Sequence, residues 1–385
     1  MFFVASSLAT LAFSFVLYRW AVDTFPALAR RRRVVALSLG ALLVVAPPMA
    51  RAAAALWQVG GPIQSILLLS VATLAFAAIP IGAMHLAFWA AHRTKNLGGR
   101  AAPAQALGMT RRQLVEAAGG GVFLGATGSM LAWGAVRGRH AFELREVPVR
   151  IEGLPRALDG YVIAQISDIH AGTYVGEREL REGLERVREA RADLVVVTGD
   201  LVDLDKRFGP LVARMVADLA PRDGVTAVLG NHDYYTGAVS VADALRDAGI
   251  DVLVDAGKVV RPNDGGGFAL LGVDDLWAKR HGRPGPRLDR ALSMVPGGLA
   301  RVLLSHQPQT VERWPGQVAL QLSGHTHGGQ INPGFRLADL FFDYVAGRYS
   351  VGGTTLYVNS GFGTVGPPSR VGAPPEVSRI VLVAA

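Results

Sequence analysis

The chain has 385 residues, of which 50% are hydrophobic and 18% are charged, a composition too apolar for an entirely soluble protein. It contains no cysteine, which excludes disulfides, thiolate nucleophiles and cysteine-bound zinc, so any metal site must use His, Asp, Asn or Glu. The net charge of +8 lies largely in arginine clusters that flank apolar runs, so membrane topology explains it and we expect no nucleic-acid binding.

Long apolar runs in residues 1–136 predict an α-helical transmembrane region. A helix needs about 20 apolar residues to cross a hydrocarbon core of about 30 Å. We predict membrane helices over residues 2–18, 34–50, 63–91 and 114–136. Pro47 and Pro48 should end or kink the second helix, because proline lacks the N–H that a helix needs. Glu116 interrupts the fourth run.

The basic residues between these helices predict an orientation. They gather at 19–33 and 93–112, whereas the loop between the second and third helices has only Arg51. The positive-inside rule makes both basic loops cytoplasmic and places the C-terminal domain outside a bacterial-type cytoplasmic membrane. The pair Arg111 and Arg112 before the fourth helix fits a twin-arginine export signal or a simple positive-inside anchor, and both place that domain on the same side.

From about Phe142 onward, short β-rich runs alternate with amphipathic helices, which predicts an α/β domain with largely buried sheets. The predicted strands are 161–167, 194–198, 225–229, 268–273, 301–305, 318–323, 354–359 and 380–383. Helices are predicted at 177–190 and 210–220. We place a linker at 137–145 and the domain itself at 146–385.

Side chains that can bind metal ions stand directly after several of these strands. Of the nine histidines, five lie in short loops at strand ends, together with Asp, Asn or Gly. The loops carry Asp168 and His170; Asp200; Asn231, His232 and Asp233; His306; and His325 with His327. Because ligands of α/β domains collect at the carboxyl ends of strands, we expect these loops to meet at one site.

The residue types suit a cage for cations. Asp200 offers two oxygens that can bridge two ions, and Asn231 offers an amide oxygen without charge. Oxygen and imidazole ligands without sulfur favour Mn, Fe, Zn or Ni. Glycines in the same loops permit sharp turns and close approach of the backbone: Gly199, Gly230, Gly324 and Gly328. Each motif alone has an ordinary explanation, such as a capped turn, but their succession favours a metal centre.

The order DxH, GDxxD, GNHD, a single His and GHTH resembles the signature of the calcineurin-like metallophosphoesterases, over about residues 145–385. The phrases SDIHAG, LSGHTHGGQ and NSGFGT are similar to a membrane-associated bacterial branch that includes twin-arginine-exported phosphodiesterases. The resemblance implies an α/β sandwich of two mixed β-sheets flanked by helices, here preceded by the α-helical transmembrane region. It also implies a dinuclear metal centre.

The resemblance further implies a set of ligands and a reaction. One divalent ion would be held by Asp168, His170, Asp200 and His327, and the second by Asp200, Asn231, His306 and His325. A hydroxide held by these ions would cleave a phosphoester, of the phosphodiester or diphosphate kind. His232 would stabilise the phosphoryl charge or protonate the leaving oxygen. We expect Asp233 to orient His232, and Asp203 to be a turn or supporting carboxylate.

The motifs fix neither the substrate nor the oligomeric state. An extracytoplasmic site tethered to a membrane suits a lipid head group, a cell-envelope diphosphate or a nucleotide. Residues 337–345 form an apolar cluster after the GHTH loop, which either packs in the core or forms a lip that faces lipid.

Two other classes of function stay open. A non-catalytic sensory or scaffold module would bind the metals without turnover, although the complete ligand set and His232 argue against it. A transporter or channel would need interior charges or polar pairs in the membrane helices, and the sequence shows few. A metalloprotease and a P-loop protein are excluded, because neither HExxH nor a P-loop occurs.

Overall fold

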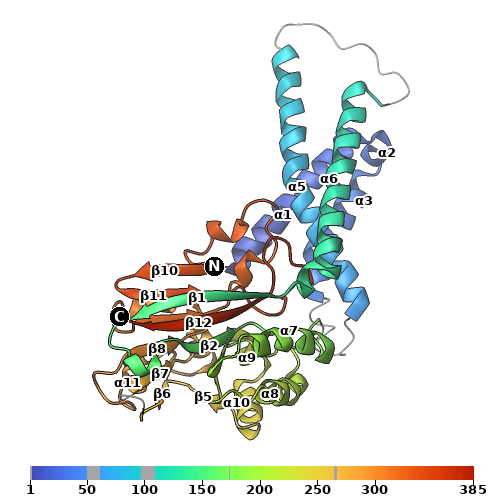
Figure 1. The fold of residues 1–385 in the computed structure, drawn as a ribbon. Coiled ribbons are helices and arrows are strands. Elements are labelled where there is room, and N and C mark those ends of the chain that lie inside the picture. Colours follow the sequence, from blue (N-terminus) through green and yellow to red (C-terminus); the bar gives the residue numbers. More distant parts are fainter. Residues whose placement is uncertain (1, 50–60, 97–108, 173, 264–266) are drawn as a thin grey trace. The chain divides into compact units, whose positions relative to one another are not determined.

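A computed structural model describes residues 2–49, 61–96, 109–172, 174–263 and 267–385 (Figure 1). The chain divides into two compact units, Met1–Trp133 and Gly134–Ala385. We call them the helical unit and the catalytic unit.

The described part of the helical unit consists of helices. They are α1 (Phe2–Thr24), α2 (Pro26–Ala29), α3 (Arg32–Gly40), the π-helical turn η1 (Ala41–Val45), α5 (Gly61–Asn96) and α6 (Arg111–Val136). Three stretches of the described residues are long and apolar enough to cross a membrane: Arg32–Met49, Ile63–Arg93 and Arg111–His140. Side chains at residues 2–7 lie outside the description, so a crossing by residues 2–18 stays a prediction.

The two prolines of the second predicted span do not end its helix. Residues 46–49 are helical and follow η1 directly. We attribute the π-helical turn to Pro47 and Pro48, because a wider turn relieves the clash between a proline ring and the carbonyl one turn earlier.

The helical unit contains one cluster of polar side chains around a buried carboxylate, which is compatible with the expectation of few interior charges. The Glu116 carboxylate is 1% exposed and accepts hydrogen bonds from Thr24 Oγ1 at 2.9 Å and Arg112 Nε at 2.8 Å. His85 lies between two carboxylates, with Nδ1 3.2 Å from Glu116 and Nε2 3.3 Å from Asp23. Ionisable groups in membrane helices are rare unless they are paired. This cluster therefore fastens α1, α5 and α6 together.

Glu116→Ala tests this fastening. It removes the acceptor of Arg112 and Thr24, so the stability of the helical unit should fall by roughly 2 kcal/mol. The measurement is thermal unfolding of the full chain in detergent, with Val122→Ala, which alters an exposed side chain on the same helix, as the control. Equal transitions for both variants would show that the cluster does not hold the helices.

The catalytic unit contains two six-stranded sheets. The first has the order β1 (Glu143–Ile151), β12 (Glu376–Ala384), β2 (Tyr161–Ile166), β3 (Leu194–Thr198), β4 (Val225–Val228) and β5 (Asp251–Val252). The second has the order β10 (Gly347–Val351), β11 (Thr354–Val358), β9 (Leu320–Ser323), β8 (Arg301–Leu304), β7 (Phe268–Gly272) and β6 (Ala256–Val260). Neighbours run parallel except β12 with β2, β10 with β11, and β6 with β7, so both sheets are mixed.

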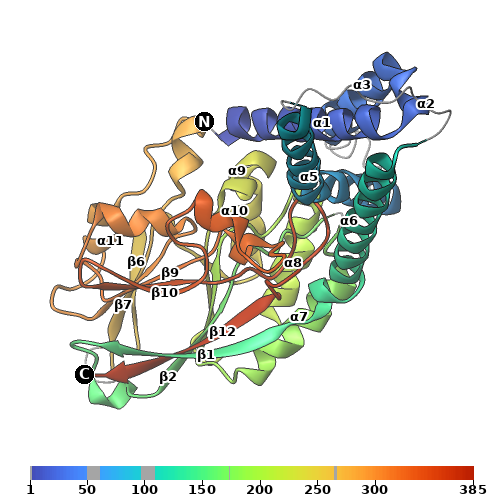
Figure 2. The same ribbon diagram turned by 90° about the horizontal axis from the view of Figure 1, so that it is seen from above.

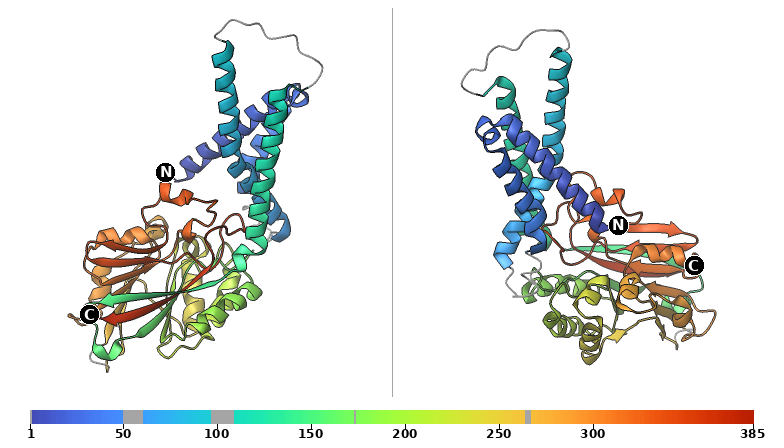
Figure 3. Two further views of the ribbon diagram at one scale, coloured as in Figure 1. Left: turned by 45° about the horizontal axis from the view of Figure 1, so that its top comes forward. Right: turned by 180° about the vertical axis from the view of Figure 1, so that it is seen from behind.

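The two sheets pack face to face over an apolar core that contains Ile163 and Val196 from the first sheet and Leu270 and Val302 from the second (Figures 1 and 3). Figure 2 shows helices α7 (Glu177–Glu189), α8 (Gly209–Ala217) and α10 (Ala238–Asp247) along the first sheet, and α11 (Leu288–Leu292) beside the second. Separate apolar clusters bind these helices to their sheets. The predicted sandwich of two mixed sheets flanked by helices is confirmed.

All eight predicted strands and both predicted helices are present. Their ends differ little, although the last strand is 376–384 rather than 380–383, and α8 ends at 217 rather than 220. The strands that were not predicted are β1, β5, β6 and β10, and each lies at the edge of a sheet. Residues 143–145, inside the predicted linker, belong to β1 and pair in parallel with β12.

Candidate metal centre

The carboxyl ends of five parallel strands bring the predicted metal-binding side chains together. The loops after β2, β3 and β4 in one sheet meet those after β8 and β9 in the other. Asp200, after β3, lies in the middle: its Oδ2 is 3.5 Å from His170 Nε2 and 3.3 Å from His306 Nε2. The other predicted ligands fall into two groups on either side of this carboxylate.

The first group joins the DxH loop to the GHTH loop. Ligand atoms of Asp168, His170 and His327 all lie within 4.8 Å of one another. His327 Nε2 is 3.6 Å from Asp168 Oδ1 and 3.0 Å from His170 Nε2. All three side chains are buried. Buried acceptor atoms that face each other this closely suit a shared cation.

The second group lies on the other side of Asp200. Ligand atoms of Asp200, His306 and His325 also lie within 4.8 Å of one another. His306 Nε2 is 3.1 Å from Asn231 Oδ1 and 3.2 Å from His325 Nδ1. The structure therefore places all seven predicted ligands in two adjoining groups, and Asp200, a member of the second, also lies 3.5 Å from His170 of the first.

The backbone at these ligands is strained. Five of them have a positive φ, in the left-handed region that L-residues rarely adopt: Asp168 at 53°, His170 at 49°, Asp200 at 54°, His325 at 75° and His327 at 52°. Such conformations cost on the order of 1 kcal/mol each and concentrate at functional sites. Here they turn successive side chains of short loops inward toward one point.

Two glycines let the backbone pass against the ligand carboxylates. A Cβ on Gly230 would lie 2.2 Å from Asp200 Oδ1, and one on Gly324 would lie 2.2 Å from Asp168 Oδ2 and 1.9 Å from Ser167 Oγ. No side chain fits at either position, so the predicted need for glycine is confirmed at both.

Hydrogen bonding and charge leave the imidazoles ready to act as ligands. His306 Nδ1 lies 2.8 Å from the Thr198 carbonyl oxygen and donates to it, which leaves the Nε2 lone pair facing Asp200 and Asn231. Burial lowers the pKa of His170 to about 4 and that of His325 to about 3, so both rings stay neutral.

The carboxylates of the site need a positive charge. Burial raises the pKa of Asp168 to about 6. Burial opposes a charge on His306 as well, but the Asp200 carboxylate outweighs it and raises the pKa of that imidazole well above its usual value. Without another cation, a proton on His306 balances the carboxylates. Two carboxylates, an amide oxygen and four imidazoles, with no sulfur, fit divalent ions of the Mn, Fe, Zn or Ni type.

His232 borders the cage and was not predicted as a ligand, although one of its ring nitrogens lies within 4.8 Å of ligand atoms of His170 and Asp200. Its backbone N–H donates to Asp200 Oδ1 at 2.8 Å, and its side chain is 19% exposed. Burial opposes a charge on this ring, but the carboxylates of Asp200 and Asp203 outweigh it and raise its pKa. A raised pKa favours the protonated form of the ring, which is the form that can donate a proton.

The expectation that Asp233 orients His232 was wrong. His232 Nδ1 lies 3.0 Å from the Asp203 carboxylate instead. Asp233 is at the third position of α9 (Asn231–Thr236), where an acidic side chain turns back to the free N–H groups of the helix start. It accepts the N–H groups of Asp200, Leu201 and Gly230, each at 2.9 Å. Asp233 thus ties the Asp200 loop to the helix that carries His232.

The sequence analysis missed Arg370, which is 1% exposed beneath the site. Its guanidinium donates to the carbonyl oxygens of Ser360 at 2.7 Å and Gly361 at 3.0 Å, and its Nη2 lies 3.3 Å from His327 Nδ1. Arg370 therefore supports the loop after β11 and the ring of His327. No local pattern marks an arginine as buried, so sequence alone did not reveal it.

A sixth loop, after β7, also reaches the site. Asp275 is 2% exposed, and both of its oxygens lie 3.0 Å from Gln307 Nε2, next to His306. Burial raises the pKa of Asp275 to about 6. This residue stands directly after a predicted strand, so the rule that found the other five loops also applies to it.

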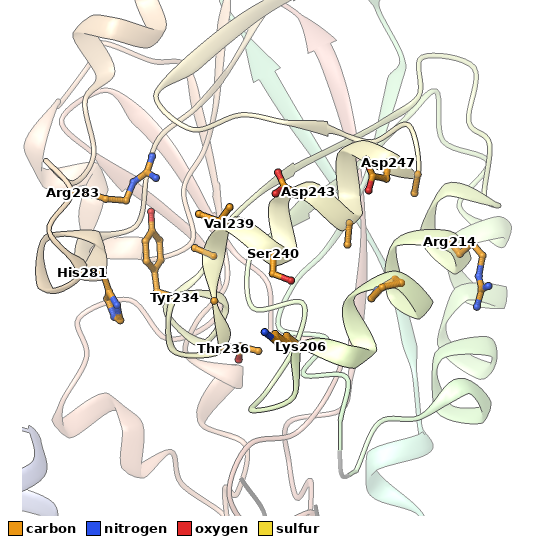
Figure 4. A pocket seen from close by; sticks show the side chains of 15 residues that line it. Lys206, Arg214, Tyr234, Thr236, Val239, Ser240, Asp243, Asp247, His281 and Arg283 are labelled. Carbon is orange, nitrogen blue, oxygen red and sulfur yellow. The ribbon is translucent and has the colours of Figure 1, made fainter. Parts of the chain in front are cut away.

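A hollow of about 1050 Å³ lies elsewhere on the catalytic unit, between α8, α9, α10 and residues 281–283. Figure 4 shows Tyr234, His281 and Arg283 on one side of it and Lys206 and Ser240 on another. None of the predicted ligands lines it. It is separate from the metal-binding side chains.

Several known proteins are similar to this chain. Residues 161–329 match the calcineurin-like phosphoesterase family. An uncharacterized metallophosphoesterase of Bacillus subtilis, YkuE, is 30% identical over 290 residues, which cover 71% of this chain and 98% of that protein. A transmembrane protein with metallophosphoesterase domain from Danio rerio is 35% identical over 266 residues, which cover 66% of this chain and 61% of that protein. A solved dimetal phosphatase from Danio rerio has a TM-score of 0.35 at 14% identity, over 53% of this chain and 88% of that one.

This chain belongs to the calcineurin-like metallophosphoesterases. The family and these relatives are named for the metal-dependent hydrolysis of phosphoesters. The three apolar helices, together with the relative named as a transmembrane protein, indicate association with a membrane.

The roles of Asp203 and Asp233 can be separated by substitution. Asp203→Asn should lower kcat about 10- to 100-fold at unchanged metal content, because the Asp203 carboxylate lies 3.0 Å from His232 Nδ1 but 3.9 Å from Nδ1 of the predicted ligand His170. Asp233→Asn should instead lower metal content and melting temperature, since it disturbs the acceptor of four backbone N–H groups. The measurements are turnover of an aryl phosphodiester, elemental analysis and thermal unfolding; the reverse pattern would contradict the assignment.

Gly324→Ala should abolish metal binding, because its methyl group would overlap Asp168 and Ser167. Gly297→Ala is a suitable control, since a Cβ there meets nothing within 4 Å and neither this glycine nor Gly324 has a positive φ. Calorimetric titration with Mn²⁺ measures the difference, and equal metal affinity in the two variants would refute it.

Proposed function

We propose that this protein hydrolyses phosphodiester or diphosphate bonds at a dinuclear metal centre. The observation that carries the proposal is the place of Asp200, whose carboxylate lies between two groups of buried ligands. One ion would be held by Asp168, His170, Asp200 and His327, and the other by Asp200, Asn231, His306 and His325.

When bound, two divalent ions would polarise the phosphoryl oxygens and lower the pKa of the attacking water. Residues of the chain itself would set the charge of the cage and hold its loops in place. Asn231 adds an oxygen without a charge, so the cage does not become too negative for an anionic phosphoester. The Asp233 carboxylate holds the backbone of the Asp200 loop in place.

His232 would act at the leaving oxygen. Its ring lies against that of His170, with centroids 4.6 Å apart, and Asp203 fixes its Nδ1. A proton on Nε2 can therefore be donated to the departing oxygen or can stabilise the negative charge on the phosphoryl group.

The distribution of basic residues supports an assignment of the side of the membrane on which the catalytic unit lies. The basic residues at 19–33 and 93–112 favour the cytoplasm, so the helix that leads into the catalytic unit would deliver it outside a bacterial-type cytoplasmic membrane. The substrate would then be a lipid head group or a cell-envelope diphosphate. Because the natural chain has no cysteine, labelling of Val239→Cys by a membrane-impermeant thiol reagent in intact cells tests this orientation.

A non-catalytic sensory or scaffold module is the alternative. Such a module would keep the ligand cage, but it would not need a proton donor such as His232 beside the cage, held in place by the Asp203 carboxylate. His232 and Asp203 therefore favour an enzyme.

Metal removal and one substitution test the proposal. The full chain loaded with Mn²⁺ should hydrolyse an aryl phosphodiester, and a chelator should abolish the activity reversibly. His232→Gln should lower kcat by about 100-fold or more at unchanged metal content. His140→Gln is the control, because His140 pairs with Glu182 outside the cage. Metal binding without any turnover in the natural chain would favour the sensory module.

A further inference from the structure

Three exposed apolar side chains gather in one short segment of the catalytic unit. Phe335, Leu340 and Phe341 are 56%, 74% and 70% exposed and lie within seven residues of one another. Among the other exposed apolar residues of this unit, Met294 stands alone and Val239 is accompanied only by Tyr235. Clusters of this kind mark a surface that contacts lipid or another molecule. We call residues 335–342 the lip.

The lip is ordered and forms part of the rim of the metal centre. It contains the turn η8 (Leu337–Leu340), after which the N–H groups of Phe341 and Phe342 donate to the Ala338 carbonyl at 2.9 and 3.0 Å. The ring of Phe342 meets that of the predicted ligand His325 edge to face, with centroids 6.3 Å apart. A molecule held by the exposed part of the lip is therefore held beside the cage.

The predicted apolar cluster at 337–345 is divided between core and surface. Val345 is 1% exposed and its carbonyl accepts a hydrogen bond from Thr326 Oγ1, which anchors the lip to the GHTH loop. Polar side chains stand among the exposed apolar ones, and Arg336 pairs with Asp339 at 3.2 Å. Such an amphipathic segment suits the boundary between lipid head groups and acyl chains.

The catalytic unit follows closely along the chain on a stretch that is able to span a membrane. The last stretch able to span a membrane runs to His140, and β1 begins at Glu143. The two residues that connect His140 to Glu143 can bridge no more than about 11 Å. A domain that follows a membrane span this closely along the chain has lipid within reach, and lipid is the partner that an exposed apolar lip fits.

We propose that the lip inserts into the membrane surface and that the site takes phosphoester substrates carried by a lipid chain. This inference rests on the proposed phosphoester hydrolysis and narrows its substrates to those that carry a lipid chain. The scissile phosphoester would sit at the cage while the acyl part stays against Phe335, Leu340 and Phe341.

Insertion can be measured in the full chain, reconstituted in nanodiscs of phosphatidylcholine and phosphatidylglycerol. Bimane on Phe341→Cys should be quenched by doxyl-labelled lipid, whereas bimane on Val239→Cys or Met294→Cys should not. Quenching only by aqueous iodide would overturn the proposal. Protection from both quenchers would overturn it as well, because it would mean that protein covers the lip.

The substrate class can be measured with two substrates that share one scissile bond. Hexadecyl p-nitrophenyl phosphate, embedded in the nanodisc, is compared with water-soluble methyl p-nitrophenyl phosphate. Phe341→Asp should raise KM for the hexadecyl substrate by roughly tenfold or more, since the transfer of one aromatic side chain into lipid is lost, and should leave the methyl substrate unchanged. Met294→Asp should alter neither.

The outcomes separate this inference from the proposed function. Equal effects of Phe341→Asp on both substrates, or no effect on either, would overturn the role of the lip while hydrolysis itself stands. Failure of the metal-loaded natural chain to hydrolyse either substrate would refute the proposed function, and the quenching experiment would still decide whether the lip enters the bilayer.

Discussion

The site depends on one carboxylate, that of Asp200, being held between two sets of imidazoles. Two buried ligand groups without a shared member would be two separate, weaker sites. The backbone N–H of Asp200 and the two oxygens of its side chain all have assigned partners, so the carboxylate has little freedom to rotate. Strained loops, close-packed glycines and the buried Asp233 can all be understood as supports for this position.

The central part of the fold was predictable because its signal is local. The strands that carry ligands are short, fully buried runs such as LVVVT, followed at once by polar residues. The strands that were missed all lie at sheet edges, where burial is partial. In β10, for example, no position is fully buried. Pro148 can stand in β1 because an edge strand does not need every backbone N–H as a hydrogen-bond donor.

The ligands of the site were predictable, whereas most of the contacts that support them were not. Ligands follow from residue type and position after a strand, which is why seven of them meet in two groups. Supporting contacts depend on which loops become neighbours in space. Asp203 rather than Asp233 meets the ring of His232, and Arg370 approaches His327 from 43 residues away. The pairing of Glu116 with His85 across helices was hidden for the same reason.

Asp233 has a consequence for how such a protein diversifies. Because one carboxylate binds the N–H groups of both the Asp200 loop and the start of α9, the bridging ligand and His232 form a single rigid block. Selection cannot adjust one without displacing the other. The lip and the segment after β7 are outside this block, so new specificities can arise there by mutation while the ancestral chemistry is inherited intact.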